Sequence, residues 1–140
     1  MKTQLGVWID HKSAVIVALL DSHVETRIVE SNASRHIKAT DGKSSYAPNG
    51  GRDITPDDIR EREFAEQLNV YYERVLAAMA SADNIYIMGP GEAKDELCKH
   101  LEKAGLSMRI CTVEAAQRLS GRQIVARVKE YFNKVPARSY

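Results

Sequence analysis

The first thirty residues hold three strand-like runs, and the gaps between these runs are only a few residues long. Residues 5–9 and 13–20 are apolar and rich in β-branched side chains, whereas residues 24–28 alternate between apolar and polar. Alternation with a period of two is typical of a strand with one buried face. Gaps this short leave no room for a helical crossover, so the sequence predicts a three-stranded antiparallel meander.

A long helix is predicted after residue 55. Thr55, Pro56, Asp57 and Asp58 stand in the order of an N-cap, an N1 proline and two first-turn carboxylates. Apolar residues then recur at spacings of three and four, which predicts a helix with one buried stripe. The stripe consists of Phe64, Leu68, Tyr72, Val75 and Met79.

Two further strand–helix pairs complete the pattern. Residues 85–88 and 108–111 are short apolar runs that predict strands, and a helical pattern follows each of them. Gly105 is expected just past the end of the first of these helices, and residues 120–123 form a capping box that opens the second. The residues expected on the buried sides are Leu97, Leu101 and Ala104 in the first helix, and Ile124, Val128 and Phe132 in the second.

The element order is therefore three strands, helix, strand, helix, strand, helix. Right-handed crossovers place the last two strands parallel to the first one, in the same sheet. The sequence thus predicts an α/β fold with a ribonuclease H-like mixed sheet, helices being packed on the sheet. We expect one domain over residues 1–135 and a frayed tail at 136–140.

Composition narrows the function classes. The 140 residues carry a net charge of +1, so no global field favours nucleic acid or membrane. No apolar run approaches the roughly 18 residues needed to cross a bilayer, and no signal segment opens the chain. Cys98 and Cys111 form no disulfide framework and are expected to be small core residues. These features predict a cytoplasmic protein with no membrane partner and no cofactor.

A long segment, residues 31–54, lacks any apolar period and is rich in Ser, Asn, Gly and Asp. Such loops are typically functional or mobile, so we expect this to be the most mobile interior segment. Tyr46 adds a ring on which a base can stack. Basic loops with an aromatic residue suit contact with irregular RNA, the alternative being a solvated loop. Between residues 31 and 52 the single acidic residue is Asp41, and the basic residues are Arg35, His36, Lys38, Lys43 and Arg52.

The run from Gly89 to Lys94 (GPGEAK) joins a predicted strand to a predicted helix. Gly89, Pro90 and Gly91 suit a tight turn, and the helix start offers unpaired N–H groups to an anion, with Lys94 adding charge. Glu92 opposes an anion there, and the run lacks both the third glycine of a dinucleotide fingerprint and a following GK[ST]. A structural turn and an anion-binding loop are both open interpretations.

The run IYIMGPGEAKDELCKHL resembles the strand–turn–helix of the middle domain of archaeal and eukaryotic class I peptide-chain release factors and Pelota-type ribosome rescue factors. The opening GVWIDHKSAVIVALL is similar to the first strands of that domain and of small bacterial relatives. The resemblance spans about residues 5–111 and implies a ribosomal partner or tRNA. It offers no counterpart to the domains that read a codon or bind a GTPase, so it implies a stand-alone factor.

In release factors, the loop between the third strand and the first helix carries a Gly-Gly-Gln motif that helps water attack peptidyl-tRNA. The corresponding residues here are Gly50, Gly51 and Arg52. Arginine binds phosphate but has no acceptor with which to position water. The resemblance thus implies binding of the ribosome or tRNA without efficient hydrolysis. The residues expected to bind RNA are Arg35, Lys38, Lys43, Gly50, Gly51 and Arg52.

Two other functions are weighed against this one. Asp10 follows the first strand, where ribonuclease H-like nucleases place a metal-binding carboxylate, but residues 85–88 carry no second carboxylate, so a turn is favoured and no metal site is predicted. The other function is a homodimeric interaction module, in which Trp8, Tyr71, Tyr72 and Tyr86 would cover the dimer face unless core packing accounts for them. Of the adjacent pair Tyr71 and Tyr72, one ring is expected in the core and the other nearer the surface.

Overall fold

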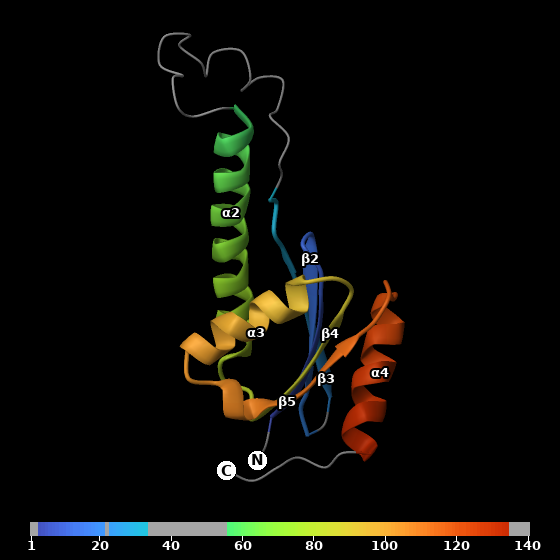
Figure 1. Ribbon diagram of the computed structural model, residues 1–140. Helices are drawn as coiled ribbons and strands as arrows, with labels where there is room; N and C mark the ends of the chain where they lie inside the picture. The colour runs from blue at the N-terminus through green and yellow to red at the C-terminus, as the bar shows by residue number, and fades with distance from the viewer. Residues whose placement is uncertain (1–2, 22, 34–55, 135–140) are drawn as a thin grey trace.

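The computed structural model describes residues 3–21, 23–33 and 56–134. Within these residues five strands form one sheet in the order β3-β2-β1-β4-β5 (Figure 1). The strands are β1 (Gln4–Ile9), β2 (Ser13–Leu19), β3 (Val24–Glu30), β4 (Asn84–Gly89) and β5 (Ile110–Ala115). β2 is antiparallel to both β1 and β3, whereas β4 is parallel to β1 and to β5. The predicted mixed sheet is therefore confirmed.

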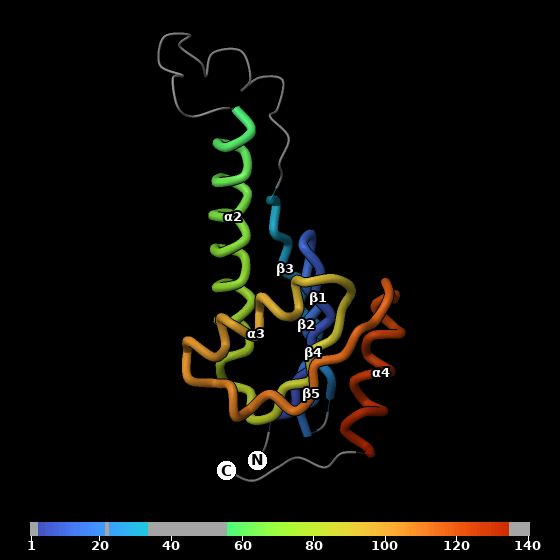
Figure 2. Tube along the Cα trace, in the orientation of Figure 1, coloured from blue at the N-terminus to red at the C-terminus, as the bar shows by residue number. Residues whose placement is uncertain are grey.

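Helices cover both faces of this sheet. The three helices are α2 (Pro56–Met79), which follows β3, α3 (Ala93–Lys103), which follows β4, and α4 (Gly121–Lys134), which follows β5. In Figures 1 and 2, α2 and α3 lie together on one face and α4 lies alone on the other. Side chains of β1 alternate between these two layers: Leu5, Val7 and Ile9 pack under α2 and α3, and Trp8 packs under α4.

The buried stripes of the helices follow the predicted spacing, with one exception. Phe64, Leu68, Tyr72, Val75 and Met79 are buried in α2, and Ile124, Val128 and Phe132 are buried in α4. Ala104 was expected to be buried and is exposed, because α3 ends there. Gly105 has a φ of 79°, its N–H bonds to the carbonyl of Glu102, and the N–H of Leu106 bonds to the carbonyl of Leu101. This Schellman motif turns Leu106, not Ala104, toward the core.

The last strand begins later than predicted. Residues Ser107–Arg109 form a short 3-10 helix, η2, and the side chain of Met108 is 75% exposed. β5 then runs from Ile110 to Ala115, so the expected boundaries of 108 and 111 were wrong. Arg109 holds this turn, because its N–H donates to the carbonyl of Leu106 and its guanidinium donates to the carbonyls of Ala80 and Ala82, so pairing with β4 starts only at Ile110.

The N-terminal part of α2 extends past the sheet (Figure 1). The helix has 24 residues and is therefore about 36 Å long. Its first buried residue is Phe64, so the turns before it project as a stalk. Among the described residues, no helix is both long and apolar enough to cross a membrane. The predicted mobile segment lies outside the described residues from position 34 onward, as do Thr55 and the expected tail at 136–140.

Candidate functional site at the carboxyl edge of the sheet

The carboxyl ends of the parallel strands β1 and β4 lie side by side, since Trp8 pairs with Met88. A turn at Asp10–Lys12 follows β1, and the Gly89–Gly91 turn follows β4. Ligand sites in open α/β sheets form outside the carboxyl ends of parallel strands. These two turns, with the helix residues packed on them, are the candidate site, and we call it the carboxyl edge.

Steric constraints shape the Gly89–Gly91 turn. A Cβ atom on Gly89 would lie 2.1 Å from the carbonyl oxygen of Ile9, and the φ of Gly89 is 155°. Gly91 has a φ of 63°, with no atom within 4 Å of where its Cβ would be. The N–H of Ala116 donates to the carbonyl of Gly89 at 3.1 Å. The first glycine thus lets the turn approach β1 closely, and the second reverses the chain into α3.

Lys94 folds back on this turn. Its ammonium nitrogen, Nζ, donates to the carbonyl of Gly91 and lies 3.9 Å from a carboxylate oxygen of Asp95. Glu92 is the N-cap residue of α3, and its carbonyl accepts the N–H groups of Asp95 and Glu96 at 3.0 Å each. The geometry supplies a structural role for Gly89, Gly91 and Lys94. Anion binding by this turn stays a prediction.

Asp10 organises the β1–β2 turn. One carboxylate oxygen accepts the backbone N–H groups of Lys12 and Ser13, both at 2.8 Å. The other oxygen lies 3.4 Å from Arg118, whose guanidinium stands 5.7 Å from the centre of the Trp8 ring. In residues 3–21, 23–33 and 56–134, no three His, Cys, Asp or Glu side chains are placed to hold a metal ion.

Glu96 connects α3 to α2 and to the β1–β2 turn. Its carboxylate accepts a hydrogen bond from the hydroxyl of Tyr72 and lies 3.2 Å from Nε2 of His11. Burial, together with this hydrogen bond, raises the pKa of Tyr72 far above its ordinary value. The Tyr72 ring also packs against His100, whose Nδ1 lies 2.7 Å from the carboxylate of Glu73. This network fixes the two helices against the carboxyl edge.

Both tyrosines of the adjacent pair are buried, Tyr71 at 0% and Tyr72 at 2% exposure, so the expectation of one surface ring was wrong. The two side chains point about 100° apart on α2, but both directions are covered. Tyr71 points at the sheet and donates to the carbonyl of Asp10 at 2.9 Å, whereas Tyr72 points at α3. Trp8 and Tyr86 are also 2% exposed, so the four aromatic rings cannot form the dimer face suggested by the sequence.

The end of β3 and the C-terminal half of α2 both bond to the β1–β2 turn. On the β3 side, the hydroxyl of Ser31 donates to the carbonyl of His11 at 2.6 Å, and the N–H of Ser31 donates to the carbonyl of Lys12 at 2.8 Å. On the α2 side, Tyr71 holds the helix to the same turn. The carboxyl edge thus holds the end of β3 and the body of α2 to one turn.

The predicted RNA-binding residues lie outside the described residues: Arg35, Lys38, Lys43, Gly50, Gly51 and Arg52. Sequence reasoning placed the Gly89–Gly91 turn correctly after a strand, but it gave no role to Glu96, Arg118 or Ser31. Their only sequence signal is position, because each lies next to the carboxyl end of a strand or in the first turn of a helix that follows one.

No protein-family model and no curated protein matches this sequence. Solved structures do match its fold. Pelota from Thermoplasma acidophilum superposes with a TM-score of 0.55 at 15% identity over 96% of this chain, and Pelota from Archaeoglobus fulgidus with 0.54 at 14% over 91%. The archaeal translation termination factor aRF1 gives 0.52 at 16% over 91%. The chain shares its fold with part of Pelota and of aRF1.

The match covers only part of each of these solved structures. This chain spans 33% and 31% of the two Pelota chains and 34% of the aRF1 chain, so it corresponds to about a third of each. Pelota and release factors are the proteins that the GPGEAK run resembles, and at the level of fold that resemblance is confirmed.

Proposed function

We propose that this protein is a translation-associated factor that binds the ribosome or tRNA and does not efficiently hydrolyse peptidyl-tRNA. The observation that carries the proposal is the fold shared with Pelota and with a translation termination factor over 91–96% of the chain. The residues proposed to contact RNA are Arg35, Lys38, Lys43 and Gly50–Arg52, all in the segment between β3 and α2.

The described geometry supports a protruding contact. The first turns of α2 project from the sheet, and its C-terminal half is fixed by Tyr71, Tyr72 and the core beneath them (Figure 1). The first described residue after this segment, Pro56, is the start of that projecting helix. Residues 31–52 carry four Lys and Arg side chains against a single Asp, although the whole chain has a net charge of only +1. Local charge of this kind attracts phosphate without a global basic field.

The proposed lack of hydrolysis rests on Arg52. A water molecule that attacks an ester needs a group that orients it, and such positioning is worth several orders of magnitude in rate. Arginine donates hydrogen bonds but accepts none. We expect Arg52 to contact a phosphate and leave the water unpositioned.

Ribosome co-sedimentation over a series of salt concentrations tests the proposal. We expect Arg52→Ala to weaken association at low salt and to reduce the slope of log K against log salt by about 0.7–0.9, the loss of one phosphate contact. Lys129→Ala is the matched control, because Lys129 is an exposed cation on α4, across the sheet from the stalk. Its slope should equal that of the wild type. Unchanged binding of Arg52→Ala would remove Arg52 from the RNA contact.

Ester cleavage is measured on the same ribosomes. The wild type and Arg52→Ala should both leave peptidyl-tRNA intact, and Arg52→Gln should not create efficient release. Robust cleavage by the wild type would overturn the second half of the proposal. The nuclease alternative has no supporting observation, because the carboxylate of Asp10 is engaged by the turn it organises.

A further inference from the structure

β3 is an edge strand whose outer side is open. It pairs with β2 on one side, and no other strand of the described residues pairs with it. An exposed edge presents a row of backbone donors and acceptors to any strand of matching shape. Ile28, in the middle of this strand, is 63% exposed, the second most exposed of the large apolar side chains in the described residues.

The register of the β2–β3 hairpin shows which backbone groups point outward. The N–H of Leu20 donates to the carbonyl of His23 at 2.9 Å, and the N–H of Ser31 donates to the carbonyl of Lys12 at 2.8 Å. Hydrogen-bonded and non-hydrogen-bonded pairs alternate between these two points. The backbone groups of residues 25, 27 and 29 therefore face β2, and those of residues 24, 26 and 28 face outward.

The open stretch has a defined end. The guanidinium of Arg74, on α2, donates to the carbonyl of Glu30. That carbonyl is the next outward acceptor after Ile28, so the helix occupies the edge at this point. The stretch available for pairing runs from Val24 to Ile28, five residues.

These five residues, VETRI, are complementary to themselves when the strand is reversed. Each end is apolar, Glu25 and Arg27 carry opposite charges, and Thr26 is the centre. We propose that the open edge of β3 pairs antiparallel with β3 of a second copy of this chain, about a two-fold axis at Thr26. Val24 then lies opposite Ile28 of the partner subunit, and Glu25 lies opposite Arg27 of the partner subunit.

Backbone and side chains select the same register. With the axis at Thr26, outward-facing residues meet outward-facing residues, giving about six hydrogen bonds between the two strands. Glu25 and the partner's Arg27 form a non-hydrogen-bonded pair, in which opposite side chains are closest. Sliding the strands by two residues in either direction places Glu25 opposite the partner's Glu25, or Arg27 opposite the partner's Arg27. Both alternatives oppose like charges.

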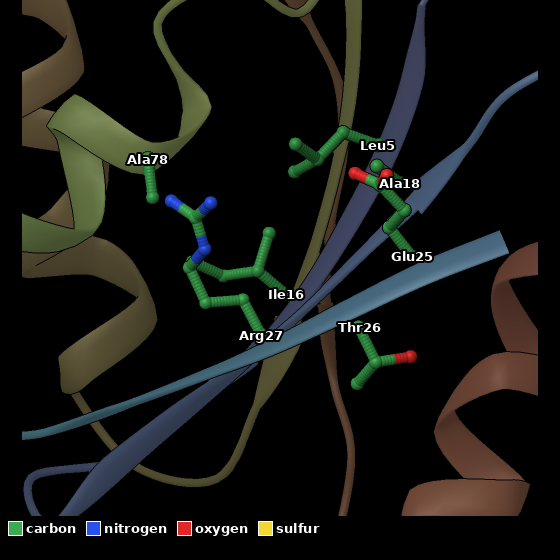
Figure 3. A pocket seen from close by; sticks show the side chains of 7 residues that line it. All are labelled: Leu5, Ile16, Ala18, Glu25, Thr26, Arg27 and Ala78. Carbon is green, nitrogen blue, oxygen red and sulfur yellow. The ribbon is translucent and has the colours of Figure 1, made fainter.

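The two charged side chains stand on the same face of the edge. Glu25 and Arg27 line a hollow of about 420 Å³ between β3 and Ala78 of α2 (Figure 3). Figure 3 shows the Arg27 side chain lying over Ile16 toward Ala78. Within the described residues no carboxylate forms an ion pair with Arg27, and the carboxylate of Glu25 touches only His23, at 3.3 Å, with 64% of its side chain exposed. Both charges are therefore available to a partner.

Amide hydrogen exchange combined with sedimentation velocity tests the pairing in the full chain. A five-residue strand pair is a small interface, so we expect a weak dimer that is populated only at high protein concentration. The amides of Val24, Thr26 and Ile28 should exchange fast in dilute solution and become protected as the dimeric fraction rises with protein concentration. The amides of Glu25 and Arg27, which bond to β2, should be protected at every concentration.

Charge reversal identifies the register. Glu25→Arg and Arg27→Glu each place like charges opposite one another in the homodimer, and each should raise its dissociation constant roughly tenfold to a hundredfold. An equimolar mixture of the two variants should form a heterodimer with a dissociation constant similar to that of the wild-type dimer. The reason is that one strand then carries two positive charges and the other two negative ones. Lys99→Glu, an exposed charge reversal on α3, is the matched control and should leave the dimer unchanged.

Each remaining outcome overturns the proposal. A wild type that stays monomeric at millimolar concentration refutes it. So does a dimer that both charge-reversal variants retain, because the interface then lies elsewhere. Protected amides at Thr26 and Ile28 in a monomer would mean that a segment of the same chain covers the edge. None of these results bears on ribosome binding, so this proposal and the proposed function fail independently.

Discussion

Replacing each glycine of the Gly89–Gly91 turn by alanine separates a steric requirement from an ordinary turn. At Gly91 the added Cβ meets nothing within 4 Å, and the only penalty is the left-handed φ of 63°. That penalty is about 1–2 kcal/mol, partly offset by about 0.4–1 kcal/mol from the reduced entropy of the unfolded chain. We expect Gly91→Ala to cost about 1 kcal/mol.

Gly89→Ala should cost considerably more. Its Cβ would lie 2.1 Å from the carbonyl oxygen of Ile9, whereas real Cβ atoms essentially never come within 3.0 Å of another heavy atom. The blocking atom is backbone at the carboxyl end of the central strand β1, so β1 and β4 have to separate there by about 1 Å. Strain at a φ of 155° adds about 1–3 kcal/mol. With two weakened backbone hydrogen bonds at about 1 kcal/mol each, the total is about 3–5 kcal/mol.

Urea unfolding followed by circular dichroism measures the free energy of unfolding of both variants against that of the wild type. A domain of this size has about 5–15 kcal/mol of stability, so Gly89→Ala removes a large fraction and Gly91→Ala a small one. The m-value should stay constant for both variants. Equal costs for the two substitutions would refute the close approach of the turn to β1.

Four further outcomes are expected. Gly6→Ala should cost about 1–3 kcal/mol, because its Cβ would lie 2.3 Å from a methyl carbon of Val128, and Val128→Ala in the same chain should recover part of that loss in a double-mutant cycle of unfolding free energies. Tyr71→Phe should cost about 1–2 kcal/mol in urea unfolding, since the part-buried carbonyl of Asp10 at the β1–β2 turn loses its donor. Phosphate should raise the melting temperatures of the wild type and of Lys94→Ala by the same amount, because its general stabilising effect needs no site and Lys94 is engaged in its own turn; a larger rise for the wild type would instead favour the anion-binding interpretation. Burial raises the pKa of Cys98 to about 11, so its thiol should alkylate slowly at pH 8, and stability should fall between pH 9 and 11 as the unfolded chain loses its proton first.

The fold was predictable because its signals are local. Each strand and helix follows from periodicity and capping residues a few positions apart, and the short early gaps dictate antiparallel pairing. Gly105 was placed correctly for the same reason, since a helix end with a left-handed residue favours glycine. The start of β5 was missed because it depends on where α3 delivers the chain relative to β4, a distance that no local pattern encodes.

The candidate site also has features that the local sequence predicts and contacts that it does not predict. The sequence located the Gly89–Gly91 turn, because glycine between a strand and a helix is a local signal. It did not show that Gly89 lies against Ile9, since that contact joins two strands about eighty residues apart. Nor did it bring Tyr72 and His11 to Glu96, which come from three different elements.

What the sequence determined by itself is the list of elements, their order and the side of each that is buried, because these depend on spacing along one helix or strand. The tertiary structure alone decided what covers each side. Tyr71 and Tyr72 point in different directions on α2, and both became buried because the sheet and α3 approach from two sides. The alternation of β3 predicts a strand, yet its outer edge is open only because the chain enters the sheet at β1 and adds later strands beyond β1. Whether a side chain or a strand edge is exposed depends on which elements pack against it, and the sequence of one segment does not specify that.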